Sequence, residues 1–148
     1  MRVLLIEDEE HKANDLTKKL FASGVEHNDL TRVISVRQAV LEVTEGNFDL
    51  VIVDMALPTF SSAGGGGAAQ AVGGIEVLRA LSMAGVRAKI IIVTQYPDIL
   101  VGGNRVKLHQ AARVLSGKYN QDVLGAVLYS YKTPEWAAAF DVLLGRMK

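Results

Sequence analysis

The 148-residue chain contains no cysteine. This absence excludes disulfide frameworks, thiolate metal sites and thiol nucleophiles, and it permits the cytoplasmic location that we expect. Long hydrophobic runs are also missing near the N-terminus, where the apolar run from Val3 to Ile6 is followed at once by Glu7. Such a run is too short for a signal-peptide core or a bilayer span, so we expect a soluble protein with no membrane partner.

Neither sign of charge is in excess. Lysine and arginine together number 16, aspartate and glutamate together also number 16, and neither forms a long block. Because binding to phosphodiester backbones needs a basic surface, we expect no direct nucleic-acid partner. The length fits a single domain spanning 1–148, and a hydrophobic content of 49% is sufficient for a buried core.

Short apolar runs alternate with longer stretches of helical period, which predicts an α/β fold with a parallel sheet. The predicted strands are Val3 to Ile6, Thr31 to Ile34, Leu50 to Val53, Lys89 to Val93 and Ala126 to Tyr129. The predicted helices are Glu10 to Phe21, Val36 to about Gly46, Ile75 to Met83, Asn104 to Leu115 and Trp136 to Leu144. Ser35 and Thr133 are predicted to cap the second and the last helix.

Two segments do not fit a simple alternation of strands and helices. The segment at about 59–72 is rich in glycine, including the run Gly64 to Gly67, and we expect a flexible loop there. The segment at about 97–120 is longer than a connection and one helix require, so it contains an additional element.

Polar residues follow four of the predicted strands. Glu7 and Asp8 follow the first strand, Asp54 the third, Thr94 the fourth and Lys132 the fifth. In an open parallel sheet, ligands bind at the carboxyl ends of the strands. Each residue alone has an ordinary explanation as a helix N-terminus, a turn residue or a solvated charge. Those explanations do not account for functional groups at all four strand ends together.

Three carboxylates at one rim repel one another unless a cation neutralises them, and Mg²⁺ suits carboxylate oxygens together with a phosphate. Glu7, Asp8 and Asp54 are therefore candidate metal ligands. Asp54 is in addition a candidate nucleophile, because carboxylates attack phosphorus to give aspartyl phosphates. Thr94 and Lys132 would donate to the phosphoryl oxygens.

These residues resemble, in order and spacing, the receiver domain of two-component response regulators. The resemblance covers nearly the whole chain. It rests on the acidic pair in Leu5 to Glu9, the phosphoacceptor motif from Phe48 to Pro58, the run Ile91 to Thr94, and the segment from Gly125 to Lys132.

The resemblance implies a three-layer αβα fold, with a doubly wound five-stranded sheet in the flavodoxin-like order 2-1-3-4-5. It implies an aspartyl phosphate on Asp54, made from a histidine kinase, a histidine phosphotransfer protein or a small acyl phosphate. It implies Mg²⁺ at the acidic residues and at the backbone carbonyl of Ala56. Thr94 and Tyr129 would then change position on phosphorylation, and a downstream protein would bind the altered surface.

The chain departs from the pattern of the family in the two inserted segments and at two residues. Gln95 stands where a small residue is common, and its bulk is expected to modulate access to the phosphoryl site. Thr133 stands in place of a proline after Lys132, so the cis peptide bond of the family is not expected to be secure.

We expect a signalling phosphoprotein and not an enzyme beyond self-phosphorylation and slow autodephosphorylation. The last predicted helix ends with the sequence, so no output domain is expected. One alternative is a pseudo-receiver, which keeps the fold as a constitutive protein-interaction module. A phosphohydrolase of the haloacid dehalogenase type is a weaker alternative, because the position of its second aspartate is occupied by Ala56.

Overall fold

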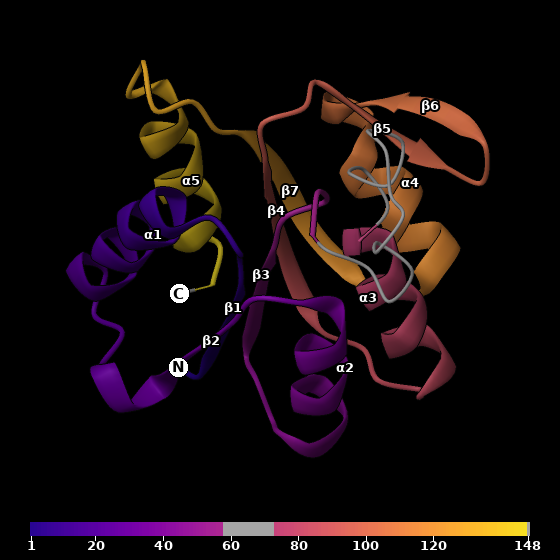
Figure 1. Ribbon diagram of the computed structural model, residues 1–148, viewed down its shortest axis with the longest axis horizontal. Coiled ribbons are helices and arrows are strands. Elements are labelled where there is room, and N and C mark those ends of the chain that lie inside the picture. The colour runs from indigo at the N-terminus through magenta and orange to yellow at the C-terminus, as the bar shows by residue number, and fades with distance from the viewer. Residues whose placement is uncertain (58–72, 148) are drawn as a thin grey trace.

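A five-stranded parallel sheet forms the centre of the molecule (Figure 1). The structure is a computed structural model that describes residues 1–57 and 73–147. The strands lie in the order β2-β1-β3-β4-β7, so the predicted order is confirmed. Their bounds are Leu30–Val33 for β2, Val3–Ile6 for β1, Leu50–Val53 for β3, Lys89–Thr94 for β4 and Asp122–Leu128 for β7.

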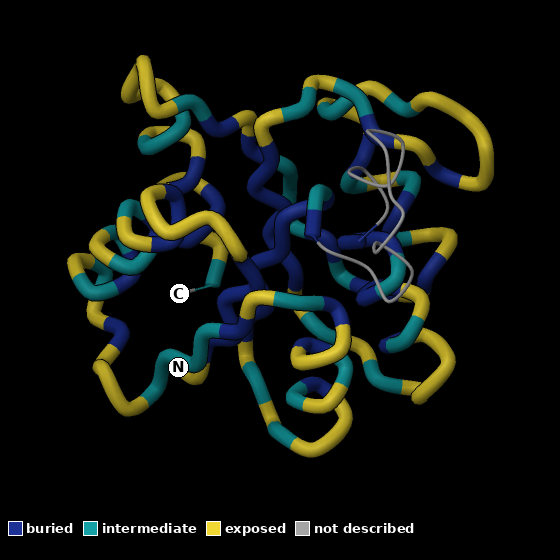
Figure 2. The backbone as a smooth tube through the Cα atoms, viewed as in Figure 1, coloured by how far each residue is buried: buried dark blue, intermediate teal, exposed yellow. Residues whose placement is uncertain are grey.

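Helices cover both faces of this sheet. One face carries α1 (Glu10–Ala22) and α5 (Glu135–Gly145). The other carries α2 (Val36–Glu45), α3 (Gly73–Met83) and α4 (Leu108–Tyr119), and a short 3-10 helix, η1 (His27–Asp29), precedes β2. The central strands β1 and β3 are buried along their whole length, while the outer sides of the helices are exposed (Figure 2). The side chains of successive strand residues alternate between two hydrophobic cores, as the pleat of a sheet requires.

The two predicted helix caps have different outcomes. The hydroxyl of Ser35 accepts a hydrogen bond of 3.2 Å from the amide of Gln38, as predicted. The prediction for Thr133 is wrong, because Pro134 occupies the N-cap of α5. The carbonyl of Pro134 already accepts the first helical hydrogen bond, from the amide of Ala137 at 3.0 Å.

The additional element predicted at about 97–120 is an antiparallel hairpin. It consists of β5 (Asp98–Val101) and β6 (Asn104–Lys107), joined by Gly102 and Gly103 with φ angles of 57° and 83°. Two positive φ values at a two-residue turn favour glycine and close a tight hairpin.

The prediction of a helix from Asn104 is therefore wrong, and α4 begins four residues later. The buried side chains of Ile99 and Val101 attach the hairpin to the core beside α3 and α4. The glycine-rich segment predicted at about 59–72, together with Pro58, lies outside the described residues.

Strand β7 contains an irregularity that affects the residues after it. Val123 pairs with Ile90, but the next pair joins Gly125 to Ile91, so one residue of β7 is bulged out. A one-residue shift moves all following side chains to the opposite face. Accordingly Val123 packs in the core beneath α4, whereas Val127 packs beneath α1 and α5.

No helix within the described ranges, 1–57 and 73–147, has both the length and the apolar character that crossing a bilayer requires.

Candidate functional site

Strand register places the predicted acidic residues side by side. Ile6 of β1 pairs with Val53 of β3, so Glu7 and Asp54 leave two neighbouring strands at the same level. The amide of Asp54 donates to the carbonyl of Ile6 at 3.2 Å, which continues the ladder one step beyond the strands. The carboxylates are thus held on backbone that the sheet itself fixes.

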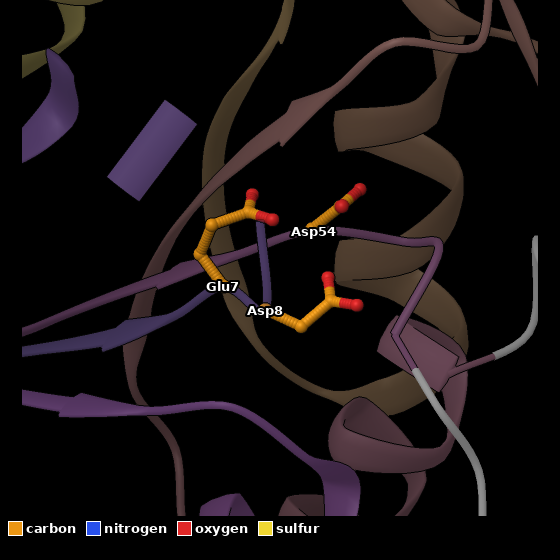
Figure 3. Close-up of side chains that lie close together, drawn as sticks. All are labelled: Glu7, Asp8 and Asp54. Atoms are coloured by element: carbon orange, nitrogen blue, oxygen red, sulfur yellow. The ribbon is translucent and has the colours of Figure 1, made fainter. Parts of the chain in front are cut away.

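Glu7, Asp8 and Asp54 form a carboxylate cluster at this rim (Figure 3). One oxygen from each lies within 4.8 Å of the others. Glu7 and Asp54 are buried, while Asp8 is exposed to solvent. Three carboxylates that offer hard oxygen ligands at this spacing fit a divalent cation such as Mg²⁺.

A lysine of α1 lies inside this cluster. Lys12 is fully buried, and its Nζ forms ion pairs with Glu7 Oε1 at 2.7 Å and with Asp54 Oδ2 at 3.1 Å. The same ammonium donates a hydrogen bond of 2.8 Å to the carbonyl of Val93 in β4. Lys12 therefore links α1 to the ends of three strands and cancels one of the three carboxylate charges.

Sequence analysis did not assign Lys12 to the site, although α1 contains a signal. Lys12 lies four residues before Leu16 and eight before Leu20, so it falls on the apolar stripe of the helix beside Ala13. A lysine in such a stripe is buried only when its charge is paired. The helical period is therefore a weak signal that Lys12 faces the core, where its charge requires a partner.

The protonation of Glu7 reflects its surroundings. Burial raises the pKa of its carboxyl from 4.5 to about 7, and the charge of Asp54 adds to the effect while Lys12 opposes it. Once Glu7 is ionised, three carboxylates face one ammonium, so the cluster carries net negative charge. A divalent cation would neutralise the remainder.

Asp54 is oriented by its neighbours. Its Oδ1 accepts a hydrogen bond of 3.1 Å from the amide of Ala56, while its Oδ2 faces Lys12. The predicted contribution of the Ala56 carbonyl to a metal site remains a prediction.

Thr94 and Gln95 lie at the end of β4, as predicted. Thr94 is fully buried, and its hydroxyl accepts a hydrogen bond of 3.3 Å from the amide of Tyr96. Gln95 is exposed and donates a hydrogen bond of 3.2 Å to Glu9, which directly follows Glu7 and Asp8 in the sequence. Gln95 thus joins the end of β4 to the segment between β1 and α1.

Lys132 does not join the carboxylates. It is exposed, forms no ion pair with a described residue, and lines a surface hollow with Asp15 and Trp136. Its bond to Thr133 is trans, as expected without proline. A second buried ammonium beside Lys12 would meet like-charge repulsion in surroundings of low dielectric constant, which favours the outward position of Lys132.

Tyr129 is buried on the α1 side of the sheet, because the bulge in β7 turns it to that face. Its hydroxyl donates a hydrogen bond of 2.7 Å to Asp15 Oδ2 of α1, and its ring lies 5.0 Å from that of Trp136. The Nζ of Lys12 lies 5.7 Å from the centre of the Tyr129 ring. Burial and the hydrogen bond to Asp15 raise the pKa of this phenol above its ordinary range.

Replacing Tyr129 with phenylalanine should lower the free energy of unfolding by about 1 kcal/mol, because it removes one hydrogen bond and little packing. Urea denaturation measures this loss. Tyr131→Phe is the control: that side chain is 66% exposed, and its replacement should change stability by less than about 0.5 kcal/mol. Equal effects of the two substitutions would show that the bond to Asp15 contributes nothing.

Comparison with known proteins extends these observations. No family model matches the chain. A curated relative, the Detocs response regulatory protein DtcB from Vibrio alginolyticus, is 29% identical over 135 residues, which span 87% of this chain and 89% of the relative.

Solved structures with the same fold include response-regulator receiver domains. The response regulator TrrA from Thermotoga maritima, in complex with Mg²⁺ and BeF, superposes with a TM-score of 0.60 at 22% identity, covering 96% of this chain and 97% of that one. The receiver domain of the sensor histidine kinase PA1611 from Pseudomonas aeruginosa, with a magnesium ion in its active-site cleft, superposes with a TM-score of 0.61 at 18% identity, covering 99% and 96%.

Proposed function

We propose that this chain, which is a receiver domain of the response-regulator type, is a phosphorylation-dependent signalling switch with Asp54 as its phosphoacceptor. The observation that carries the proposal is the carboxylate cluster at the strand ends, where Asp54 lies beside Glu7, Asp8 and a buried ammonium. A nucleophile, a metal-ligand set and a positive charge are the groups that phosphoryl transfer requires.

The transfer proceeds by attack of an Asp54 carboxylate oxygen on phosphorus. A new oxygen–phosphorus bond forms as the bond from phosphorus to the donor breaks. The electron pair of the broken bond leaves with the donor group, either a phosphohistidine imidazole or the carboxylate of a small acyl phosphate. Asp54 then carries the phosphoryl group as a mixed anhydride.

Glu7, Asp8 and Asp54, together with the backbone carbonyl of Ala56, are the proposed Mg²⁺ ligands. When bound, the metal would withdraw charge from the phosphoryl oxygens and hold them for in-line attack. Thr94, at the end of β4, would donate its hydroxyl to a phosphoryl oxygen. Gln95, through its bond to Glu9, would restrict the approach of donor and water.

The proposed partners follow from this chemistry. A histidine kinase or a histidine phosphotransfer protein would supply the phosphoryl group, and a downstream protein would bind the phosphorylated form. The new charge would shift a population between two surface conformations.

Intact-mass spectrometry after incubation with acetyl phosphate and Mg²⁺ tests the proposal. The parent protein should gain one phosphoryl group, and Asp54→Asn should gain none. Asp141→Asn is the control, because that carboxylate lies on the exposed side of α5, where it pairs with Lys19 at 2.8 Å. Equal labelling of the parent and Asp54→Asn, or no labelling of the parent, would refute the assignment.

One observation favours the pseudo-receiver as a second candidate. Lys12 supplies a positive charge to the cluster without a metal, and this charge opposes the binding of a second cation. Titration with Mg²⁺, followed by the fluorescence of the single tryptophan, Trp136, separates the candidates. A switch should respond at millimolar Mg²⁺ and lose the response in Asp54→Asn, whereas a constitutive module should respond in neither form.

A further inference from the structure

We infer that Lys12 of α1 is the residue that binds the phosphoryl group on Asp54, in the role that sequence analysis assigned to Lys132. The inference rests on the proposed function and adds to it the origin of the phosphoryl-binding cation. That cation comes from the first helix, not from the loop after the last strand of the sheet.

The position of the ammonium supports this role. Lys12 Nζ lies 3.1 Å from Asp54 Oδ2, so phosphoryl oxygens attached to Asp54 would lie within its reach. A lysine ammonium has three donors, and one of them is fixed by the carbonyl of Val93 at 2.8 Å. The other two face carboxylate oxygens, and either can move to a phosphoryl oxygen without exposing the charge. Charge-assisted bonds of this kind are stronger than neutral ones, especially where water is excluded.

Lys132 lacks these features. Its side chain is exposed, and its backbone amide donates to the hydroxyl of Ser130 at 3.2 Å within the loop after β7. An exposed lysine would have to lose hydration and side-chain entropy to enter the cluster. It would also have to approach an ammonium that is already there. Lys12 is fully buried in the position that Lys132 would need.

Further contacts hold Lys12 in place. It lies on the same face of α1 as Asp15, three residues later, and Asp15 accepts the hydrogen bond of Tyr129. The ring of Tyr129 lies 5.7 Å from the Lys12 ammonium, a distance at which the ring face attracts a cation. The ammonium is thus enclosed by carboxylates, a carbonyl and an aromatic ring. A group held in this way is preorganised for charge that develops on the phosphoryl oxygens.

The rate of labelling by acetyl phosphate and Mg²⁺ tests the inference in three glutamine variants. Lys12→Gln should label about a hundredfold more slowly than the parent, which is the loss typical of removing one oxyanion donor. Lys132→Gln and Lys18→Gln, both exposed in the structure, should label within about twofold of the parent. Slower labelling of Lys132→Gln, together with normal labelling of Lys12→Gln, would overturn the inference and leave the function of Asp54 intact. Equal rates of labelling in all variants would have the same consequence. An unlabelled parent would overturn both proposals.

A measurement on the parent decides the case in which Lys12→Gln does not fold. Nuclear magnetic resonance of protein with nitrogen-labelled lysine reports each ammonium group, and the spectrum of Lys132→Gln identifies the signal of Lys132. Addition of beryllofluoride and Mg²⁺ should shift the signal of a buried, exchange-protected ammonium and leave that of Lys132 unchanged. A shift confined to Lys132 would overturn the inference.

Discussion

Replacing Gly74 with alanine should lower the free energy of unfolding by about 3 kcal/mol, the upper part of the range for overpacking a buried site. A β-carbon at this position would lie 2.3 Å from Met55 Cε and 2.8 Å from both Met55 Cα and the carbonyl oxygen of Asp54. The methionine side chain can move, but the two backbone atoms belong to the segment that positions Asp54. The amide of Gly74 also donates to the carbonyl of Met55 at 3.1 Å, which holds the two segments together.

The matched control for this substitution is Gly117→Ala in α4. A β-carbon at Gly117 meets no atom within 4 Å. Alanine should therefore stabilise the protein by about 0.5–1 kcal/mol, because glycine is a poor helix former. Chemical denaturation of both variants measures the two changes. Stabilisation by Gly74→Ala as well would show that helix propensity outweighs the contact with the Asp54 segment.

The second large effect is a dependence of stability on pH that arises from Glu7. Its pKa of about 7 in the folded protein exceeds the ordinary value of 4.5, so the folded state retains a proton that the unfolded chain has released. The stability that this proton provides is fully present below pH 4.5 and is lost as the pH rises through about 7. One retained proton gives a maximum slope of about 1.4 kcal/mol per pH unit.

Glu7→Gln isolates this contribution, because glutamine resembles the protonated carboxyl and does not titrate. Denaturation in the presence of a chelator, over the range from pH 4.5 to pH 8, should show that the parent loses stability relative to Glu7→Gln as the pH rises. Added Mg²⁺ should reduce the difference at high pH, since a divalent cation binds an ionised carboxylate more strongly than a neutral amide. Parallel pH profiles of the two proteins would contradict the raised pKa.

The sheet and the carboxylates could be predicted because they depend on local patterns. Leu50–Val53 is a short, continuously apolar run, and the acid directly after it falls at the carboxyl end of a central strand whatever the details of packing. The same reasoning placed Glu7 at the adjacent strand end. Because neighbouring parallel strands end at the same edge of a sheet, this topology alone predicts that Glu7 and Asp54, which are 47 positions apart in the sequence, lie in one site.

The orientation of Tyr129 could not be predicted by spacing alone. It depends on a bulge of one residue in β7, and spacing along the chain does not reveal on which side of a sheet a residue lies after such a bulge. Gly125 beside the bulge is a weak signal, since glycine within a strand often marks an irregularity. The hairpin was missed for a similar reason. Residues 104–115 have helical spacing, but the two glycines before them favour a tight turn, and the turn extends strand pairing to Lys107.

The β5–β6 hairpin also bears on how copies of this protein behave at high concentration. Among the described residues, each of its two strands pairs only with the other, so each leaves one row of backbone donors and acceptors without a described strand partner. Ionic side chains border these rows: Asp98 stands opposite Lys107, and Arg105 lies 3.6 Å from Asp98. Charges on open strand edges oppose edge-to-edge pairing. These charged side chains therefore protect the hairpin against aggregation. Neutral replacements of the three residues should promote strand pairing between the hairpin edges of different molecules, in a fold that remains otherwise unchanged.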